Sequence, residues 1–396
     1  MRWQAALRRV RRWSAVAGIV ALTVVMAPGT ASAAGPWAGC PGMQAPPAPA
    51  AVEEGASPPA ALPWPAVPVG GDALGTCTAT GLPTPPGIDA VSYVVADLDS
   101  GAVLAARAPH ARERPASTLK TLLALVAMAK LDPDSEVDGI ASDLRVDGSR
   151  AGIGPGGRYT VRQLFAGLLL NSGNDTAEAL ARAMGGDGPT LAAMAAYARD
   201  HGALDTRPAT PSGLDGPGMS ASAYDLALLF RLALREPIFA ETLGTRTAAF
   251  PGYGDRPGFT LSSTEQFAPR YPGSIGSKSG FTDAARHTLI AAARKNGRRL
   301  VAVLMRGEQR PVPMWKQAAA LLDDAFAHPA APAVGTLVEV PPAVSPTSAD
   351  GAPVSIPPVE GALATGVPPA VPIAAGAVVL ACLATGLVRA ARRRRS

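Results

Sequence analysis

Two β-hairpin patterns bracket a series of helical patterns in this chain of 396 residues, and this order limits the folds open to it. The predicted strands are 91–96, 102–105, 289–294 and 300–305. Asn296-Gly297 lies between the last two, and Asn-Gly is a strong signal for a tight hairpin turn. Strands at both ends of a region predict one antiparallel sheet flanked by the helices between them, an α+β fold.

Apolar residues at helical spacing fill the region between the hairpins and continue after the second one. The predicted helices are 118–131, 161–170, 175–184, 190–201, 221–234 and 313–327. Together with the strands they span 86–328, a length that suits one domain.

The first helical pattern begins beside Ser117-Thr118-Leu119-Lys120. A serine and a lysine three apart share one face of a helix, so the lysine amine can reach the serine hydroxyl. Serine needs an adjacent base to become a nucleophile, and a lysine of lowered pKa can be that base, whereas arginine stays protonated. The 36 basic residues include only five lysines, of which Lys120 is one.

Two further short motifs follow in the chain. Ser172-Gly173-Asn174 lies between two predicted helices, and Lys278-Ser279-Gly280 lies on a predicted strand. Each of these motifs alone is compatible with a turn or a surface segment without chemistry. Their occurrence in this order after Ser117 points to one catalytic site.

The set S-x-x-K, S-x-N and K-T/S-G is the signature of penicillin-recognising serine enzymes. The chain most resembles the D-alanyl-D-alanine carboxypeptidases of peptidase family S11, the low-molecular-mass penicillin-binding proteins, over 86–328. Segment 211–220 resembles the family's N-P-x-G-L-D-x-P-x-x-x-S, and 278–282 resembles its K-T-G-Y-T. The resemblance implies a sheet flanked by helices with a helical subdomain, as in β-lactamases and transpeptidases.

The chain departs from the family pattern in three places. The segment before Gly213-Leu214 is looser than the family's, which affects no catalytic group. K-S-G replaces K-T-G but keeps the hydroxyl, so we expect the role of Ser279 to be retained. The family often has a β-rich domain after the catalytic one, whereas only a Pro- and Ala-rich stretch follows here.

The resemblance implies the following catalytic roles in cleaving a peptide that ends in D-Ala-D-Ala. Ser117 attacks the penultimate carbonyl and forms an acyl-enzyme, Lys120 takes its proton, and Ser172 relays a proton to the leaving D-alanine. The backbone N–H groups of Ser117 and Phe281 form the oxyanion hole. No cofactor is needed.

The resemblance also implies the residues that bind the substrate. Asn174 holds the peptide amide and orients Lys120. Lys278 lowers the pKa of Lys120 and attracts the terminal carboxylate, to which Ser279 donates a hydrogen bond. Gly280 lets the substrate backbone approach the strand edge. Penicillins and other β-lactams are the expected covalent inhibitors.

Several residues near these motifs have two interpretations. Arg286 is a second ligand for the carboxylate or, as we favour, a surface ion pair. We expect His287 to be a strand residue rather than a catalyst. We expect Trp64 and Trp315 to be packing residues rather than ligand platforms.

Two other functions compete with a carboxypeptidase. A class A-like β-lactamase needs a carboxylate to activate water, usually a Glu between the second and third motifs, and 205–220 contains no Glu. A catalytically idle cell-wall-binding protein is disfavoured because all the motif side chains are present.

The ends of the chain predict export and anchoring. Residues 1–33 have a basic start, an apolar run and Ala31-Ser32-Ala33, typical of a secretory signal peptide. The apolar run 371–388 reaches the lower limit for a transmembrane helix, and the tail 389–396 is basic, typical of a cytoplasmic end. We therefore expect a single-pass protein of the cell membrane with an extracytoplasmic catalytic domain.

Two Pro- and Ala-rich segments, 34–85 and 329–370, flank the domain, and we interpret the second as a spacer. The signal and tail carry ten Arg and no acidic residue, so the formal net charge of +5 becomes −5 without them. This balance does not favour nucleic acid as a partner.

The chain has three cysteines. Cys382 lies in the apolar run 371–388, whereas Cys40 and Cys77 lie in the exported N-terminal segment, where a disulfide between them would persist. The four histidines are isolated in the sequence, so we expect no metal site.

Overall fold

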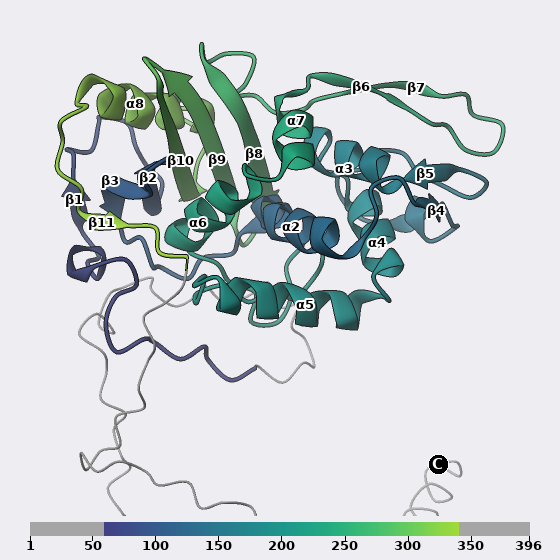
Figure 1. Ribbon diagram of the computed structural model, residues 1–396, viewed down its shortest axis with the longest axis horizontal. Coiled ribbons are helices and arrows are strands. Elements are labelled where there is room, and N and C mark those ends of the chain that lie inside the picture. The colour runs from purple at the N-terminus through teal and green to yellow at the C-terminus, as the bar shows by residue number, and fades with distance from the viewer. Residues whose placement is uncertain (1–58, 340–396) are drawn as a thin grey trace, which may run out of the picture. The chain divides into compact units, whose positions relative to one another are not determined.

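A seven-stranded antiparallel sheet forms the centre of residues 59–339, the part of the chain that the computed structural model describes (Figure 1). The strand order is β1-β3-β2-β10-β9-β8, and β11 also pairs with β3. The strands are β1 (Ala79–Gly81), β2 (Ser92–Asp97), β3 (Ala102–Arg107), β8 (Ser274–Thr282), β9 (Arg286–Lys295), β10 (Arg298–Gly307) and β11 (Gly335–Thr336). The two predicted hairpins are joined into one sheet by the pairing of β2 with β10, two strands that lie far apart in the sequence.

The turn between β9 and β10 has the geometry that its sequence predicts. Lys295 pairs with Arg298, which leaves a two-residue loop. Asn296 and Gly297 have φ values of 52° and 79°, and two positive φ values characterise the type I′ turn that suits the twist of a hairpin.

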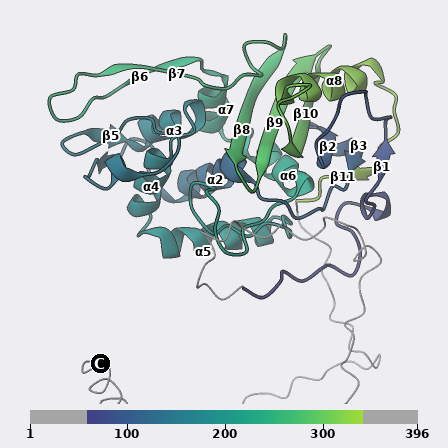
Figure 2. The same ribbon diagram turned by 180° about the vertical axis from the view of Figure 1, so that it is seen from behind.

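Both faces of the sheet are covered by helices. Helix α8 (Met314–Ala327) packs on one face against Tyr93, Val95 and Leu304. Helix α6 (Ala223–Ala233) covers the other face, where alternate strand residues such as Val94 and Val303 point, and α2 (Lys120–Lys130) packs beside α6. Figures 1 and 2 show α8 and α6 on opposite sides of the sheet. Burial on both faces explains why the central strands are almost continuously apolar.

A helical subdomain lies beside β8. It contains α2, α3 (Val161–Leu170), α4 (Asn174–Ala183), α5 (Asp187–Asp200), α7 (Pro237–Gly244) and the strand pairs β4 (Glu136–Asp138) with β5 (Arg158–Thr160) and β6 (Thr247–Phe250) with β7 (Phe259–Ser262). Short 3₁₀ helices are η1 (Asp72–Leu74), η2 (Ala116–Leu119) and η3 (Asp143–Arg145). Helix α3 begins with a capping box, in which the Thr160 hydroxyl accepts from the Gln163 backbone and the Gln163 side chain accepts from the Thr160 backbone.

The predicted helices are present with small shifts at their ends, and several features differ from prediction. The segment 118–131 begins as η2 and becomes α-helical only at Lys120. Helix α7, the two small strand pairs β4–β5 and β6–β7, and the short strands β1 and β11 in the flanking segments were not expected.

The structured body extends beyond 86–328 at both ends. In the Pro-rich N-terminal segment, Val69 and Leu74 are buried, and the Arg112 guanidinium donates to the carbonyls of Leu62 and Pro63. At the other end, the backbone N–H of Thr336 donates to the carbonyl of Gly70 at 2.9 Å. Segments that flank the predicted domain therefore contribute to its core.

The predicted segments 1–33, 371–388 and 389–396 lie outside the described residues, as do Cys40 and Cys382. Within 59–339, no helix combines the length and apolar character needed to span a bilayer. Cys77 is disulfide-bonded, and its pairing with Cys40 stays a prediction.

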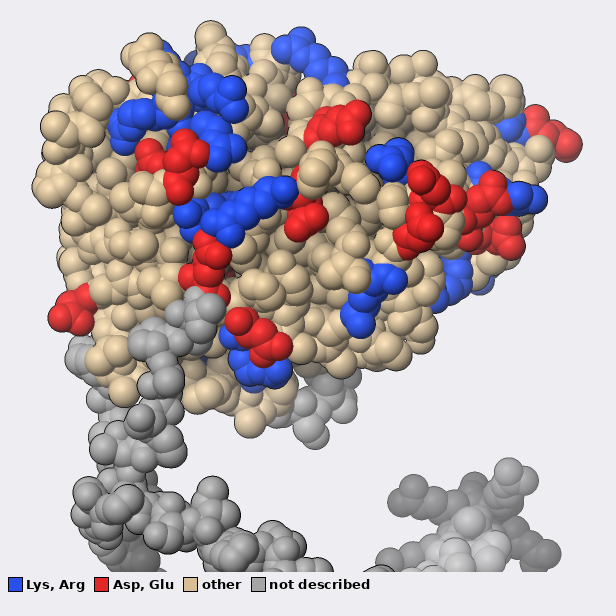
Figure 3. All heavy atoms as spheres, in the orientation of Figure 1, with Lys and Arg blue, Asp and Glu red and all other residues tan. Residues whose placement is uncertain are grey.

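Acidic and basic side chains are interspersed on the molecular face seen in Figure 3. Ion pairs also connect different elements of the described chain, among them Arg182 with the buried Asp143 at 2.9 Å. Neither sign of charge gathers into one extended patch on this face.

Candidate active site

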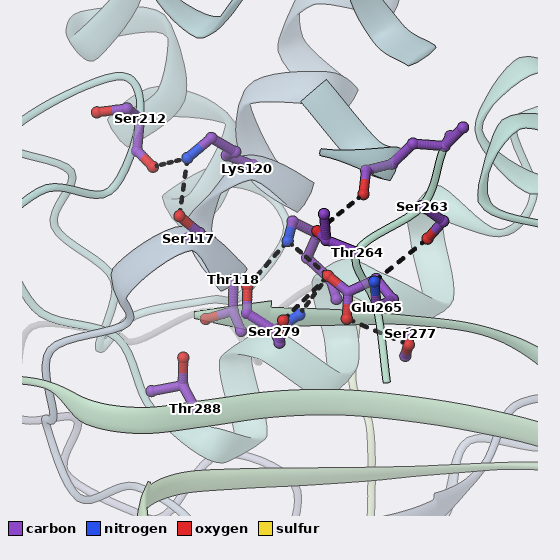
Figure 4. A network of polar contacts seen from close by, with 12 residues as sticks. Ser117, Thr118, Lys120, Ser212, Ser263, Thr264, Glu265, Ser277, Ser279 and Thr288 are labelled. Atoms are coloured by element: carbon purple, nitrogen blue, oxygen red, sulfur yellow. Dashed lines mark hydrogen bonds and ion pairs between the residues drawn. The ribbon is translucent and has the colours of Figure 1, made fainter. Parts of the chain in front are cut away.

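The Ser117 hydroxyl and the Lys120 amine are in contact. Ser117 belongs to η2, Lys120 is the first residue of α2, and Nζ lies 2.9 Å from Oγ (Figure 4). The same Nζ contacts Asn174 Oδ1 at 2.7 Å and the Ser212 carbonyl at 2.6 Å. The lysine is therefore fixed by three oxygen atoms, of which only the serine oxygen also carries a hydrogen.

Burial lowers the pKa of Lys120 well below its ordinary value, and the positive charge of Lys278 lowers it further. Asp175 and Glu178 act in the opposite direction. A neutral amine has two hydrogens and one lone pair, and the carbonyl oxygens of Asn174 and Ser212 can only accept. Once these two take the hydrogens, the lone pair faces the Ser117 hydroxyl, which is the arrangement of a general base.

The second motif forms the junction between α3 and α4. Ser172 has a φ of 56°, a left-handed conformation that is uncommon for a residue with a side chain, and it lines the same pocket as Ser117. Asn174 begins α4, and its Nδ2 donates to the Asp147 carbonyl at 2.6 Å. Both the oxygen and the nitrogen of the Asn174 carboxamide thus have protein partners. These contacts support a role in orienting Lys120 more directly than a role in binding a peptide amide.

The third motif lies on β8, the edge strand next to η2. Lys278 is fully buried, and its Nζ donates to Glu265 Oε1 at 2.9 Å and to the Ser279 carbonyl at 2.8 Å. A Cβ on Gly280 would lie 2.6 Å from the Ser117 backbone nitrogen. A side chain at position 280 would collide with the segment that carries Ser117, so glycine is required here even without a substrate. The expected approach of a substrate is a second reason for glycine.

These motifs surround a pocket of about 540 Å³. It is lined by Ser117, Gly148, Ser149, Ser172, Asn174, Leu214, Thr264, Glu265, Gln266, Phe267, Ser279, Gly280, Phe281, His287, Thr288, Leu289, Gln309, Met314 and Trp315. Lys120 and Lys278 lie beneath its surface, buried completely. Serine, base and strand edge thus converge on one cavity large enough for a peptide terminus.

Arg286, His287 and Trp315 lie outside the motifs but near the pocket. The Arg286 guanidinium pairs with Glu308 at 2.8 Å and does not line the pocket, so the ion pair is its observed role. His287 is a residue of β9, as expected, yet it also lines the pocket, as Trp315 does.

Two contributors to the site were missed in the sequence. The Ser212 carbonyl holds Lys120, and only the resemblance of 211–220 to the family segment signals its importance, because a backbone carbonyl has no residue signature. Glu265 was not predicted, because an acidic residue of the pocket was expected in 205–220, which ends well before it. Its place 13 residues before Lys278 is a weak signal on its own.

One group of potential metal ligands occurs among the described residues. Single atoms of His110, Asp205 and Asp225 lie within 4.8 Å of one another. His110 Nδ1 is already hydrogen-bonded to Asp205 Oδ2 at 2.9 Å, and Arg112 donates to Asp205 Oδ1 at 3.0 Å. The adjoining guanidinium and the internal hydrogen bonds suit a buried structural network better than a metal site.

Comparison with known proteins agrees with this geometry. The family model for D-alanyl-D-alanine carboxypeptidases, peptidase S11, matches residues 79–309. The chain belongs to this family. Among curated members of the D-alanyl-D-alanine carboxypeptidase family, DacB2 of Mycobacterium tuberculosis is 45% identical over 261 residues, covering 65% of this chain and 88% of that protein. DacD of Salmonella typhimurium is 35% identical over 238 residues, covering 56% and 59%.

Solved structures of related enzymes show the same fold. The D-alanyl-D-alanine carboxypeptidase of Mycobacterium tuberculosis superposes with a TM-score of 0.62 at 44% identity, covering 66% of this chain and 99% of that one. The DD-transpeptidase of Streptomyces K15 gives a TM-score of 0.58 at 25% identity, covering 62% and 100%. The predicted α+β sheet flanked by helices is confirmed.

Proposed function

We propose that this protein is a serine D-Ala-D-Ala carboxypeptidase that removes the terminal D-alanine from peptidoglycan stem peptides through an acyl-enzyme on Ser117. The observation that carries the proposal is the 2.9 Å contact between Ser117 Oγ and a buried Lys120 amine of lowered pKa. This pair opens onto a pocket that also contains Ser172 and the edge of β8.

Acylation uses the pair directly. Ser117 Oγ attacks the penultimate carbonyl carbon while its proton passes to the Lys120 lone pair. Negative charge develops on the carbonyl oxygen, which accepts from the backbone N–H groups of Ser117 and Phe281. Ser172 delivers its proton to the leaving amine and is reprotonated by Lys120, so the peptide C–N bond breaks, D-alanine departs and Lys120 is neutral again.

Hydrolysis of the ester reverses these transfers. Water gives a proton to Lys120 and its oxygen to the acyl carbon, and Ser117 recovers its proton as the shortened peptide leaves. A β-lactam ring opens by the same attack, which makes penicillin a covalent inhibitor. The terminal carboxylate of the substrate lies at Ser279, near the buried charge of Lys278.

For location, the signal pattern in 1–33 and the apolar run 371–388 support a single-pass protein with its catalytic domain outside the cell membrane. The Pro-rich linker 329–370 would then hold the enzyme near the cell wall. Deletion of 371–396 should release an active soluble protein, and membrane retention of that variant would place the anchor elsewhere.

The decisive experiment measures D-alanine released from an N-acylated peptide ending in D-Ala-D-Ala. The wild type should release it and bind fluorescent penicillin in a one-to-one covalent complex. Ser117→Ala should lose both while keeping the thermal unfolding midpoint within a few degrees. Full labelling of Ser117→Ala would contradict the assignment of the nucleophile, and penicillin turnover faster than peptide turnover would favour a β-lactamase.

A further inference from the structure

Glu265 binds both polar residues of the third motif. Its Oε1 accepts from Lys278 Nζ at 2.9 Å, from the Ser279 backbone N–H at 2.9 Å and from Ser279 Oγ at 3.1 Å. Its Oε2 accepts from Ser277 Oγ at 3.3 Å. Figure 4 shows these contacts converging on one carboxylate, on the loop between β7 and β8.

The same carboxylate lines the catalytic pocket, although it is only 6% exposed. Of the pocket-lining residues in the described part of the chain, Glu265 is the one that carries a formal charge. A pocket proposed to receive an anionic peptide terminus is thus lined by an anion. The nearby cation, Lys278, is buried beneath the surface and already paired with that anion.

Glu265 also occupies the hydrogen-bond donor that a substrate carboxylate needs. A serine hydroxyl has a single hydrogen, so Ser279 Oγ donates to Glu265 or to a substrate carboxylate, but not to both. A bound substrate carboxylate that takes this hydrogen lies close to a second carboxylate, and like charges at short range repel.

We propose that Glu265 is a specificity-determining residue that weakens the hold on a free terminal carboxylate, so that the enzyme accepts neutral peptide termini nearly as well as anionic ones. This inference rests on the proposed function, because it concerns the leaving-residue end of the same pocket. It assigns to Glu265 no proton transfer, since all of its contacts place it as an acceptor for Ser277, Lys278 and Ser279.

The test compares two N-acylated peptides, one ending in D-Ala-D-Ala with a free carboxylate and one ending in D-Ala-D-alaninamide. In the full-length wild type, kcat/KM for the two should differ by less than about tenfold. Glu265→Gln removes the negative charge but keeps a side-chain carbonyl that can accept. It should lower KM for the carboxylate peptide about tenfold and leave KM for the amide unchanged.

Two further variants separate charge from structure. Glu265→Asp keeps the charge and should keep the wild-type ratio of the two substrates, whereas a merely structural role would make the Asp and Gln variants alike. Glu241→Gln removes the same charge from an exposed position on α7 and should match the wild type on both substrates.

The pH profile gives an independent readout. Without Glu265, no neighbouring anion compensates the positive charge of Lys278. That charge then lowers the pKa of Lys120 further. The acidic limb of kcat/KM in Glu265→Gln should therefore move to lower pH, with no such shift in Glu241→Gln. Penicillin labelling and the unfolding midpoint report whether the variant is folded.

The outcomes are distinguishable. If the wild type prefers the carboxylate peptide a hundredfold or more, the inference is overturned even when Glu265→Gln does not fold. An unchanged substrate ratio in a folded Glu265→Gln also overturns it, while the proposed function stands. If neither peptide loses its terminal residue and penicillin does not label Ser117, the proposed function itself fails.

Discussion

A Cβ atom on Gly280 would lie 2.6 Å from the backbone nitrogen of Ser117, closer than side-chain carbons approach nitrogen in folded proteins. The strand β8 and the turn η2 are therefore in contact through a residue without a side chain. The separation between these two backbones sets where the two proposed oxyanion donors, the backbone N–H groups of Ser117 and Phe281, lie relative to each other.

Gly280→Ala should accordingly push β8 away from Ser117 and reduce kcat/KM about 100-fold, because small displacements of reacting groups are costly. Acylation by penicillin should slow by a similar factor. The matched control is Gly188→Ala in α5, where a Cβ meets no atom within 4 Å. Equal activity in the two variants would argue against a tight β8–η2 contact.

The pH dependence of catalysis follows from Lys120. Its pKa is lowered well below the ordinary value by burial and by Lys278, and only the neutral amine can accept the Ser117 proton. Activity is therefore lost as the pH falls through this lowered pKa. Lys278→Ala removes the neighbouring cation, so the acidic limb of kcat/KM should move to higher pH.

The control for that shift is Lys295→Ala, which removes the same charge from an exposed position on β9. An acidic limb that stays in place in Lys278→Ala would rule out Lys120 as the titrating base. Lys120→Arg should reduce kcat by about 1,000-fold or more at every pH, because an arginine does not give up its proton.

Stability should depend on Glu113, a buried residue on the segment that leads to Ser117. Burial raises the pKa of Glu113 to about 7, although Arg306 acts in the opposite direction. The folded state thus binds the proton more tightly than the unfolded state. The stabilisation is complete below the unfolded pKa near 4.5 and is lost as the pH rises toward 7.

Glu113→Gln should remove this dependence, so that the variant gains up to about 3 kcal/mol relative to the wild type between about pH 5 and pH 8. Urea unfolding at the two pH values measures the difference. Glu241→Gln, on the surface, should unfold like the wild type. Parallel pH profiles for wild type and Glu113→Gln would mean that Glu113 is ionised at no cost in the fold.

The acyl-enzyme formed with penicillin should persist. Glu265 is the carboxylate in the pocket, and its contacts with Ser277, Lys278 and Ser279 hold it as an acceptor rather than as a base for water. We expect the penicilloyl ester to decay at least about 100-fold more slowly than the peptide ester turns over. Mass spectrometry of the intact protein over time, set against steady-state release of D-alanine, measures both rates.

Local signals in the sequence predicted the elements whose formation depends on local contacts. Helix α3 was predicted residue for residue, because a capping residue, an apolar run and a turn motif coincide at 160–172. The β6–β7 pair was missed. Its strands have four residues each, mostly exposed, and the eight residues between them contain Pro-Gly twice, a turn signal that does not fix a two-residue hairpin.

The contacts of the candidate site also fall into local ones, which the sequence predicts, and long-range ones, which it does not. Ser117 and Lys120 are close in sequence, so their contact follows from helical geometry. The meeting of Lys120 with Ser212, and of Ser279 with Glu265, depends on how distant loops pack. Such contacts leave no periodic pattern in the sequence, and the family resemblance supplied the association of the three motifs instead.

The hydrogen bond between Gly70 and Thr336 brings the two ends of the described body together, and β11 lies against β3 beside them. A circularly permuted chain is therefore feasible. A short linker would join the segments that follow Thr336 and precede Gly70, and new termini would open in the exposed β6–β7 loop between Gly254 and Asp255. Such a protein keeps every strand pair of the central sheet. Its new termini lie in the helical subdomain, whereas the natural chain enters and leaves the described body near β1 and β11.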